Sequence, residues 1–535
     1  MNRPDSISLV SASAGETLAY NPATGERLGA IANTPLDQLP AIFARARAAQ
    51  QQWAARSFAE RRKAIERMRR YIVAHADELA RVVSEGNGKT RLDALATEVL
   101  PCTLACQWYG KNAARVLKPE RRWPASIAFI GKTSEMHHQP LGVVGIISPW
   151  NYPLSIPFGE IVMGLMAGNA ILLKVAAATP LIGQAIERIV AAGELPDGLF
   201  HHIVGSGGQV SEAFFANGID KLFFTGSVPA GKQLMAQAAA TLTPLSLELG
   251  GKDAMIVLPD ADLERAANGA AWAGYQNAGQ SCGGVERIYV HESVFQPFVD
   301  LLAAKTRALR HGADRGDFSV DIGSMTTAKQ RQFVERQLEA AVTAGATVVA
   351  RSQAVGAEGG EFTPATLVTG VTHEMSLMRD ETFGPVLPVM PFASEDQAVA
   401  MANDCTMALT ASIWTRSLAR GRALAERVNG GVVTINEHLY THGMSELPWG
   451  GPKDSGLGRT HGPEGLREMS QLKCINWDWS RAFRNLWWYP QDRATYDALR
   501  AAVHLANPVS PFDFLGASLK VLPFMLRKLY SRWRA

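Results

Sequence analysis

A cysteine in a glycine-rich polar segment is the first residue of this sequence that could do covalent chemistry. Cys282 ends the segment NAGQSC (277–282), whose composition packs poorly in a core. A nucleophilic thiol needs such backbone freedom so that a substrate can approach it, and it needs a lowered pKa. The alternative is a buried, inert cysteine, which is the more common role of a lone Cys.

Two other polar residues stand where a short apolar run ends. In an open parallel sheet this is the edge at which ligands bind. Glu248 follows the apolar run 245–247, and a carboxylate there could act as a general base. Asn151 lies in the segment PWNYP (149–153), where two prolines stiffen the backbone and could fix an amide that stabilises an oxyanion. When each motif is taken alone, a solvated carboxylate and an ordinary proline-rich turn are the favoured explanations.

Glycine turns follow two further apolar runs. Gly205-Ser-Gly-Gly208 comes after the run 200–204, and Gly226 and Ser227 come after the run 221–224. A strand, a glycine turn and a helix N-terminus together present free N–H groups and a favourable dipole to a phosphate. Neither segment is a complete G-x-G-x-x-G, and glycine turns are common in α/β proteins, so each is a weak nucleotide signal alone.

The elements that must position these residues alternate between strand and helix patterns from residue 142 onward. Helical runs at 179–193 and 229–241 separate the apolar runs, and this alternation predicts a doubly wound parallel sheet. A second α/β region follows at about 251–440, with a long helix near 326–344. The expected strands of both regions are Val143–Ile147, Ala170–Lys174, Phe200–Val204, Lys221–Phe224, Pro244–Leu249, Ile288–Val290, Thr347–Ala350 and Gly431–Ile435. Residues 41–113 are expected to form amphipathic helices.

Composition and charge exclude several classes of protein. The 535 residues carry a net charge of +3, but residues 514–535 alone carry +5, which leaves −2 for the rest. The body therefore lacks the positive surface of a nucleic-acid binder. Five cysteines are few and odd in number, as expected in a reducing compartment such as the cytoplasm. Cys102 and Cys106 are predicted to be core residues because no matching ligand pair stands nearby, and no metal site is predicted.

Targeting and anchoring signals are weak. Residues 1–16 are polar, so no signal peptide is expected, and the apolar stretch 161–173 is too short to span a bilayer. Leucines at 515, 519, 522, 526 and 529 lie on one helical face between basic residues. This face is expected to dock on a partner subunit. The alternative is peripheral membrane contact through residues 510–535.

Taken together, the motifs resemble the aldehyde dehydrogenase superfamily over roughly residues 20–480. They stand in that family's order and at its separations, with 34 positions from Glu248 to Cys282 and 23 from Asn151 to Lys174. The segments that carry the resemblance are PWN (149–151), Lys174, FTGS (224–227), ELGGK (248–252), GQSC (279–282) and ETFGP (381–385). A chance match of six motifs in order is negligible.

The resemblance implies the fold and its domains. The expected fold class is α/β, with a Rossmann-like cofactor domain, an α/β catalytic domain and a small β oligomerisation hairpin. The cofactor domain would comprise residues 1–122 and 142–250, and the catalytic domain residues 251–440. The oligomerisation or bridging elements would be 123–141 and 441–484. Residues 485–535 form a C-terminal extension beyond the usual core, and a homodimer or homotetramer is expected.

The resemblance also implies the chemistry, which is oxidation of a small-molecule aldehyde to a carboxylic acid with NAD or NADP. Cys282 would attack the carbonyl, Asn151 would hold the oxyanion, and Glu248 would activate water to hydrolyse the thioester. Lys174 would bind the adenine ribose and Glu381 the nicotinamide ribose. The cofactor-binding residues implied are Pro149, Trp150, Lys174, Gly205, Gly208, Thr225, Gly226, Ser227, Gly231, Leu249, Glu381 and Phe383.

Four positions depart from the family pattern. Ala177 stands where the family often has a glutamate that bonds the adenine ribose, and its small side chain removes a repulsion against a 2′-phosphate. We therefore expect NADP to be accepted. Asp253 and Ala254 replace the usual pair after Lys252, which alters the local loop. Glu160 occupies a helix position where several relatives carry lysine, which could change how a proton leaves Glu248.

Two other functions stay open. An enzyme of the same fold could pass the thioester to coenzyme A, but a water-activating Glu248 argues against this. A catalytically silent binding protein could use the same scaffold, but the joint presence of Cys282, Glu248 and Asn151 argues against that. The aldehyde itself is not readable from the motifs, because the loops that line a substrate tunnel determine it.

Overall fold

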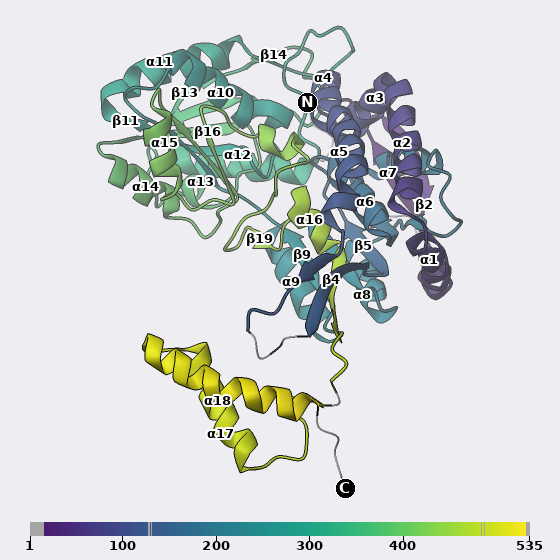
Figure 1. Ribbon diagram of the computed structural model, residues 1–535. Helices are drawn as coiled ribbons and strands as arrows, with labels where there is room; N and C mark the ends of the chain where they lie inside the picture. The colour runs from purple at the N-terminus through teal and green to yellow at the C-terminus, as the bar shows by residue number, and fades with distance from the viewer. Residues whose placement is uncertain (1–14, 127–128, 130, 483, 486, 531–535) are drawn as a thin grey trace. The chain divides into compact units, whose positions relative to one another are not determined.

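The structure is a computed structural model that describes residues 15–126, 129, 131–482, 484–485 and 487–530 (Figure 1). The chain forms two compact units. The first contains residues 1–116 and 140–470, and the second contains residues 117–139 and 471–535. Both sheets that carry the predicted motifs belong to the first unit.

A six-stranded sheet forms the first half of this unit. Its strand order is β19-β9-β8-β5-β6-β7, and all neighbours are parallel except β19 and β9. Its strands are β5 (Val143–Ile147), β6 (Ala170–Lys174), β7 (Phe200–His202), β8 (Lys221–Thr225), β9 (Leu245–Glu248) and β19 (Gly456–Leu457). Counted along the chain, the five parallel strands have the order 3-2-1-4-5 of a dinucleotide-binding fold, with the switch point between β5 and β8.

Burial explains why these apolar runs form parallel strands. Every residue of β5, β6, β8 and β9 is buried, as expected for strands covered by helices on both faces. The crossover helices are α6 (Ser155–Ala167), α7 (Pro180–Ala191), α8 (Gly207–Ala216) and α9 (Val228–Ala239). The predicted doubly wound sheet is confirmed. The predicted strand 200–204 is shorter, because its last two residues already belong to the turn before α8.

A seven-stranded sheet forms the second half. Its order is β13-β15-β16-β11-β10-β17-β18, and only β13 runs antiparallel to its neighbour. Its strands are β10 (Asp253–Val257), β11 (Val285–His291), β13 (Thr347–Arg351), β15 (Thr366–Thr369), β16 (Val386–Phe392), β17 (Thr410–Trp414) and β18 (Val432–Ile435). Helices α10 (Leu263–Tyr275) and α11 (Phe295–Ala308) pack on it, and α12 (Ala328–Thr343) confirms the long helix expected near 326–344. A continuous apolar core joins these elements.

The predicted site residues stand at the ends of strands from both sheets. Asn151, Ser227 and Glu248 come at or just after the carboxyl ends of β5, β8 and β9, which share one edge because the strands are parallel. Cys282 and Glu381 precede the amino ends of β11 and β16. The site is therefore built from the carboxyl edge of one sheet and the amino edge of the other.

The N-terminal helices contribute an unusual turn. Helix α3 (Ala76–Asn87) ends before α4 (Arg91–Ala94), which continues through a π-helical turn at Leu95–Val99 into α5 (Leu100–Val116). Such turns widen a helix locally and frequently occur at functional sites. Cys102 and Cys106 are buried in α5, in agreement with their prediction as core residues.

The second unit contains a three-stranded sheet and a pair of helices. The sheet has the order β20-β4-β3, formed by β20 (Ser470–Asp478), β4 (Lys132–Pro140) and β3 (Glu120–Arg122). Helices α17 (Arg493–Ala506) and α18 (Pro511–Tyr530) share a small core of Ala501, Val521 and Met525. The predicted apolar face of the tail is confirmed as a helix up to Tyr530, with Pro523 inside it. Residues 531–535 of that prediction lie outside the described residues.

Candidate active site

The nucleophile candidate follows a strained turn. Asn277 and Ala278 both have φ near +54°, a region that few residues without the freedom of glycine adopt. Such strain persists only where surrounding contacts impose it, and it clusters at functional sites. Gly279, with φ +70°, lies so close to the backbone of Gly384 that a Cβ would be 2.3 Å from that carbonyl. This turn holds Cys282 at the amino end of β11.

Cys282 lines two cavities at once. The larger has a volume of about 640 Å³, and the smaller, of about 10 Å³, has room for roughly one water molecule. The larger cavity is lined by Pro149, Trp150, Asn151, Thr225, Gly226, Ser227, Pro229, Leu249, Gly250, Cys282, Thr327, Lys329, Gln330, Phe333, Arg336, Glu381 and Phe383. The smaller is lined by Ile156, Glu160, Thr225, Glu248, Leu249, Cys282, Leu409, His442, Trp449, Thr460 and His461. The oxyanion candidate thus lies on one side of the sulfur and the base candidate on the other.

Asn151 lines the larger cavity and is fixed through its backbone. Its carbonyl oxygen accepts hydrogen bonds from Lys89 Nζ (2.8 Å) and from Asn277 Nδ2 (2.9 Å). Its own Oδ1 is buried and has no hydrogen-bond partner among the described residues. A backbone held at two points and an uncommitted side-chain amide suit a preorganised donor for an oxyanion.

Glu248 ends β9 as the sequence predicts, and its carboxylate is buried. Oε2 has no hydrogen-bond partner among the described residues, so it is free to accept a proton from water in the smaller cavity. Burial raises the pKa of Glu248 well above its usual range, Glu160 raises it further, and Arg459 acts in the opposite direction. A raised pKa brings a carboxylate closer to the range in which a general base works at neutral pH.

The thiol of Cys282 differs from expectation in its acidity. A nucleophilic thiol is expected to have a lowered pKa, but burial raises the pKa of Cys282, and Asp253, Glu381 and Glu248 raise it further. Desolvation and the nearby carboxylates both disfavour a further negative charge on the sulfur, although Cys282 is only half-buried.

Glu381, Trp150 and Phe383 line the larger cavity, and each is half-buried. Gly251 N–H donates to Glu381 Oε1 at 3.1 Å. A Cβ on Gly250 would lie 2.7 Å from Glu381 Oε2, so a side chain at position 250 would clash with the carboxylate. Burial raises the pKa of Glu381 to about 8, with Glu286 adding to the effect. The ring of Phe383 meets that of Trp150 edge-on at 5.5 Å.

The chemistry of the larger cavity fits a dinucleotide. It contains Ser227, which precedes α9 without capping it by its side chain, so the N–H groups of the first turn stay available to a pyrophosphate. Lys174 is buried, has no ion-pair partner among the described residues, and lies 3.6 Å from where a Cβ on Gly207 would stand. Burial lowers the pKa of Lys174 to about 8. An unpaired lysine beside an open helix start suits an anionic group.

Four of the predicted cofactor residues do not line this cavity: Lys174, Gly205, Gly208 and Gly231. Gly231 instead packs under Leu249, where a Cβ would lie 2.7 Å from Cδ2, so its role is to let α9 approach the strand end. A Cβ on Gly208 would meet no described atom within 4 Å, so the space around its backbone beside Gly207 is open.

Several residues that support the site were missed from the sequence. Glu286 accepts hydrogen bonds from Thr382 N (2.7 Å) and Phe383 N (2.8 Å) and pairs with Lys252 at 2.7 Å, so it fixes the segment after Glu381. Lys89 and Glu98 form a second buried pair beside Asn151. The signal available for Glu286 was charge inside a buried strand, where it is followed directly by Arg287.

Comparison with known proteins agrees with this geometry. Residues 9–475 match the aldehyde dehydrogenase family. The chain is 36% identical over 479 residues to a 4,4'-diapolycopene aldehyde oxidase of Methylomonas sp, covering 90% of this chain and 89% of the relative. It is 37% identical over 453 residues to a putative NADP(+) succinate-semialdehyde dehydrogenase of Mycobacterium ulcerans, covering 84% and 86%. A Mycobacterium tuberculosis aldehyde dehydrogenase solved with NAD+ superposes with a TM-score of 0.81 at 30% identity, covering 87% and 95%.

The chain therefore belongs to the aldehyde dehydrogenase family. It is an NAD(P)-dependent enzyme that oxidises an aldehyde to a carboxylic acid, on a fold with a Rossmann-like cofactor half and an α/β catalytic half.

Proposed function

We propose that Cys282, Asn151 and Glu248 carry out this oxidation through a covalent thioester. The observation that supports the proposal is that Cys282 lines both cavities, with Asn151 on the side of the larger cavity and Glu248 on the side of the smaller. The thiolate attacks the aldehyde carbonyl, and the Asn151 amide and the Cys282 backbone N–H stabilise the oxyanion. Each such donor typically contributes about 10²–10³ in rate.

Hydrolysis of the thioester falls to Glu248. Its free Oε2 takes a proton from a water in the smaller cavity while the water oxygen bonds to the acyl carbon. The carbon–sulfur bond then breaks and the thiolate of Cys282 is restored. General-base assistance of this kind typically contributes about 10²–10⁴.

In this proposal the cofactor is held by residues of the larger cavity together with Lys174, which does not line it. Glu381 bonds the nicotinamide ribose, Ser227 and the start of α9 bind the pyrophosphate, and Lys174 binds the adenine ribose. When bound, the cofactor supplies the hydride acceptor and a positive ring that favours the thiolate. We propose that NADP is accepted as well as NAD, because Ala177 adds no carboxylate near a 2′-phosphate while Lys174 attracts it.

The test is the time course of NADH formation in single and multiple turnovers. Cys282→Ala should form no NADH with any aldehyde. Glu248→Gln should release about one NADH per active site in a burst and then stall, because acylation survives and hydrolysis does not. A Glu248→Gln enzyme that turns over at the wild-type rate would contradict the assignment of the base.

Assembly and compartment are also proposed on indirect support. We propose a homodimer or homotetramer, as expected from the family, with the oligomerisation element in the sheet of β3, β4 and β20.

All five cysteines are free, which supports a reducing compartment such as the cytoplasm. No described helix is long and apolar enough to cross a membrane.

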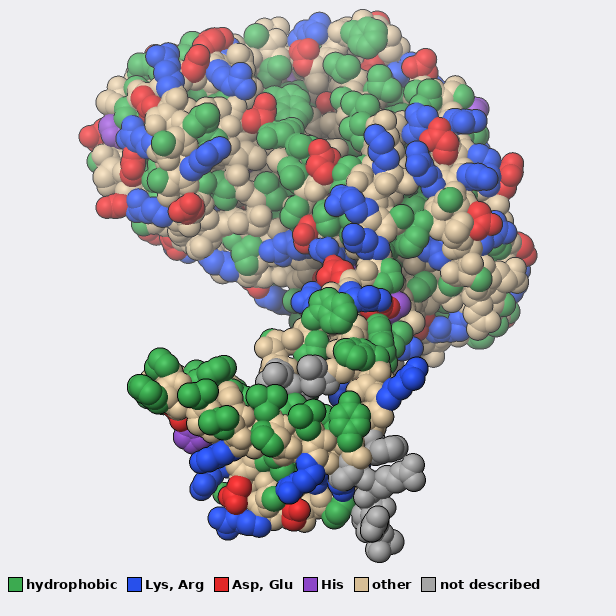
Figure 2. All heavy atoms as spheres, in the orientation of Figure 1, with side chains coloured by type: hydrophobic (Ala, Val, Ile, Leu, Met, Phe, Trp, Pro, Cys, Tyr) green, Lys and Arg blue, Asp and Glu red, His purple; other side chains and the backbone are tan. Residues whose placement is uncertain are grey.

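We further propose that residues 510–535 contact an anionic membrane surface. Figure 2 shows hydrophobic side chains gathered along one side of the α17–α18 pair and Lys and Arg gathered along the other. Leu515, Leu519, Leu522 and Leu526 are each 48% to 69% exposed on one face of α18. A helix with an apolar face, flanking aromatic residues and basic residues is typical of peptides that lie in the interface of a bilayer.

Charge favours a lipid surface over a second copy of the chain. Residues 480–535 contain nine Lys and Arg against three Asp, a net charge of +6. Two copies of this surface would repel each other, whereas each basic residue near an anionic leaflet contributes about 1 kcal/mol. Binding to a membrane would bring the enzyme to apolar aldehydes dissolved in the lipid. Such a substrate class agrees with the name of one relative, which specifies a diapolycopene aldehyde.

The membrane proposal is tested by co-sedimentation with vesicles of phosphatidylcholine, with and without phosphatidylserine. The full chain should pellet with the anionic vesicles only. Exchange of Leu519, Leu522 and Leu526 for serine should abolish pelleting, while the control Leu242→Ser, an 88% exposed leucine elsewhere, should not. If the triple variant instead changes the oligomeric state and the full chain does not pellet, the face is a subunit contact.

A further inference from the structure

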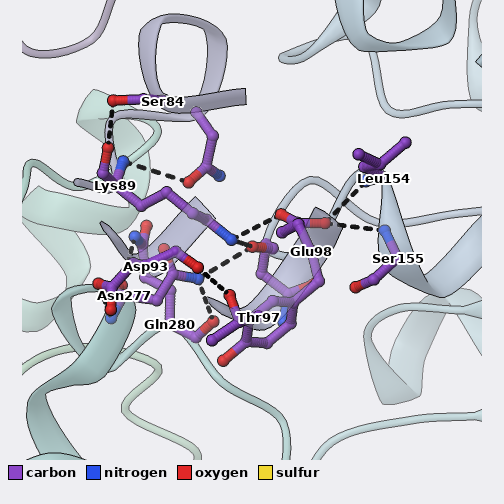
Figure 3. A network of polar contacts seen from close by, with 12 residues as sticks. Ser84, Lys89, Asp93, Thr97, Glu98, Leu154, Ser155, Asn277 and Gln280 are labelled. Atoms are coloured by element: carbon purple, nitrogen blue, oxygen red, sulfur yellow. Dashed lines mark hydrogen bonds and ion pairs between the residues drawn. The ribbon is translucent and has the colours of Figure 1, made fainter. Parts of the chain in front are cut away.

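A buried network of charges surrounds the backbone of the oxyanion residue. Lys89 lies in the loop between α3 and α4, and Glu98 lies in the π-helical turn that follows α4. Neither side chain is exposed at all, and Lys89 Nζ lies 2.6 Å from Glu98 Oε1 (Figure 3). A fully buried ion pair is costly to desolvate, so a protein gains little stability from it alone. Its position beside the site calls for another explanation.

The pair fixes both ends of the segment that carries Asn151. Lys89 Nζ donates to the Asn151 carbonyl at 2.8 Å and lies 4.3 Å from the centre of the Tyr152 ring. Glu98 Oε2 accepts hydrogen bonds from the backbone N–H groups of Leu154 (2.9 Å) and Ser155 (2.8 Å), at the start of α6. The two partners therefore hold a short loop between the end of β5 and α6 in one conformation.

The same carbonyl connects this loop to the nucleophile. Asn277 Nδ2 donates to the Asn151 carbonyl at 2.9 Å and to Gln280 O at 3.0 Å. The backbone N–H of Asn277 donates in turn to Asp93 Oδ2 at 3.2 Å, and Figure 3 shows Asp93, Lys89 and Glu98 pointing into one cluster. Segments from the helical region, the cofactor half and the catalytic half thus meet at one peptide group.

We propose that Lys89 and Glu98 are positioning residues that set the direction of the Asn151 amide towards Cys282. A carbonyl that accepts two hydrogen bonds fixes the plane of its peptide group and hence the direction of the Asn151 side chain. Displacement of an oxyanion donor by about 1 Å reduces catalysis strongly, because such donors act through preorganised geometry. The proposal rests on the proposed role of Asn151 as oxyanion donor.

A neutral double variant tests this without leaving one buried charge alone. Lys89→Met together with Glu98→Gln removes the donor to Asn151 and keeps the shape of both side chains. The rate constant of the NADH burst should fall about 10- to 100-fold, less than the 10²–10³ typical for loss of the donor itself. In an Asn151→Ala background the same double substitution should change that rate by no more than about two-fold, since the donor to be positioned is gone.

A matched control separates positioning from loss of stability. Arg61 is also a buried cation, and it donates to Met166 O at the other end of α6, far along the helix from Asn151. Arg61→Met should lower the thermal midpoint comparably and leave the burst rate within about two-fold of wild type. Asn277→Gly, which removes the second donor to the same carbonyl and tolerates φ +54°, should reproduce the slow burst if the double variant does not fold.

The outcomes are distinct. An equal fold-loss in the wild-type and Asn151→Ala backgrounds, or a loss of the same size in Arg61→Met, would overturn the positioning role. A Glu248→Gln enzyme that releases no NADH burst with any aldehyde would instead contradict the proposed mechanism, and the two failures cannot be confused.

Discussion

Gly450 leaves the space that the carboxylate of Glu248 occupies. A Cβ on residue 450 would lie 2.5 Å from Glu248 Oε1, closer than side-chain atoms approach one another. Gly450 has φ +130°, in the region that favours glycine. The orientation of the proposed base therefore depends on a segment that lies far from it in the sequence.

Substitution of this glycine should impair hydrolysis and spare acylation. Gly450→Ala should displace the Glu248 carboxylate and lower steady-state turnover about 10²-fold, within the range of lost general-base assistance, while the NADH burst persists. Gly443→Ala is the control, because a Cβ there meets nothing within 4 Å. Stopped-flow fluorescence of NADH measures both phases. A burst that disappears together with turnover would show that residue 450 supports acylation too.

Removal of the carboxylate of Asp253 should make the thiol more acidic. Asp253 is the first of the carboxylates that raise the pKa of Cys282 after burial itself. Burial also raises the pKa of Asp253. Asp253→Asn removes the ionisable carboxyl and keeps the oxygen that accepts a hydrogen bond from Thr410 N. The thiolate is then favoured, so the rate of alkylation by iodoacetamide should rise at lower pH than in the wild type. Asp317→Asn, at an exposed position, should leave this profile unchanged, and an Asp253→Asn profile that moves to higher pH would contradict the expected repulsion.

A second carboxyl facing the smaller cavity should shift the pH dependence of hydrolysis. Burial raises the pKa of Glu160 to about 8, and Glu160 in turn raises the pKa of Glu248. Glu160→Gln removes this repulsion, so Glu248 should ionise at lower pH and the acid limb of the hydrolysis rate should move to lower pH. The measurement is the single-turnover decay of the acyl-enzyme between about pH 5 and 9, a range that includes the raised pKa of Glu160. An unchanged limb would show that the two groups do not interact.

A carboxylate at position 177 should reverse the proposed acceptance of NADP. Ala177 is half-buried, three residues after Lys174. Ala177→Glu should repel a 2′-phosphate and lower kcat/KM for NADP by about 10-fold or more relative to NAD, since each 1.4 kcal/mol corresponds to a tenfold change. Ala177→Gln, which matches its size without the charge, should change the ratio less. Strict use of NAD by the wild type would contradict the starting proposal.

The sequence predicted the parts of this molecule that local pattern determines. The predicted apolar runs form buried parallel strands. Glu248 and Asn151 lie at or after the ends of such strands, where polar side chains can reach a ligand. The neighbours of Asn151 could not be predicted in this way. Lys89 and Glu98 reach it only through tertiary packing, and nothing in their own segment marks them as partners of a distant loop. The raised pKa of Cys282 also could not be predicted from the sequence, since it depends on burial and on carboxylates from distant parts of the chain, Glu248 and Asp253 on one side and Glu381 on the other.

The short pairing of β19 with β9 has a consequence for the order in which the enzyme is made. Gly456 pairs with Glu248, and Ser455 O accepts the hydrogen bond of Leu249 N–H, so this late segment completes the seat of the base. Synthesis runs from the N-terminus, and earlier parts fold first. Residues 151 and 282 consequently leave the ribosome well before position 456. A nascent chain thus carries Cys282 for a time before the segment that completes the seat of Glu248 has been made.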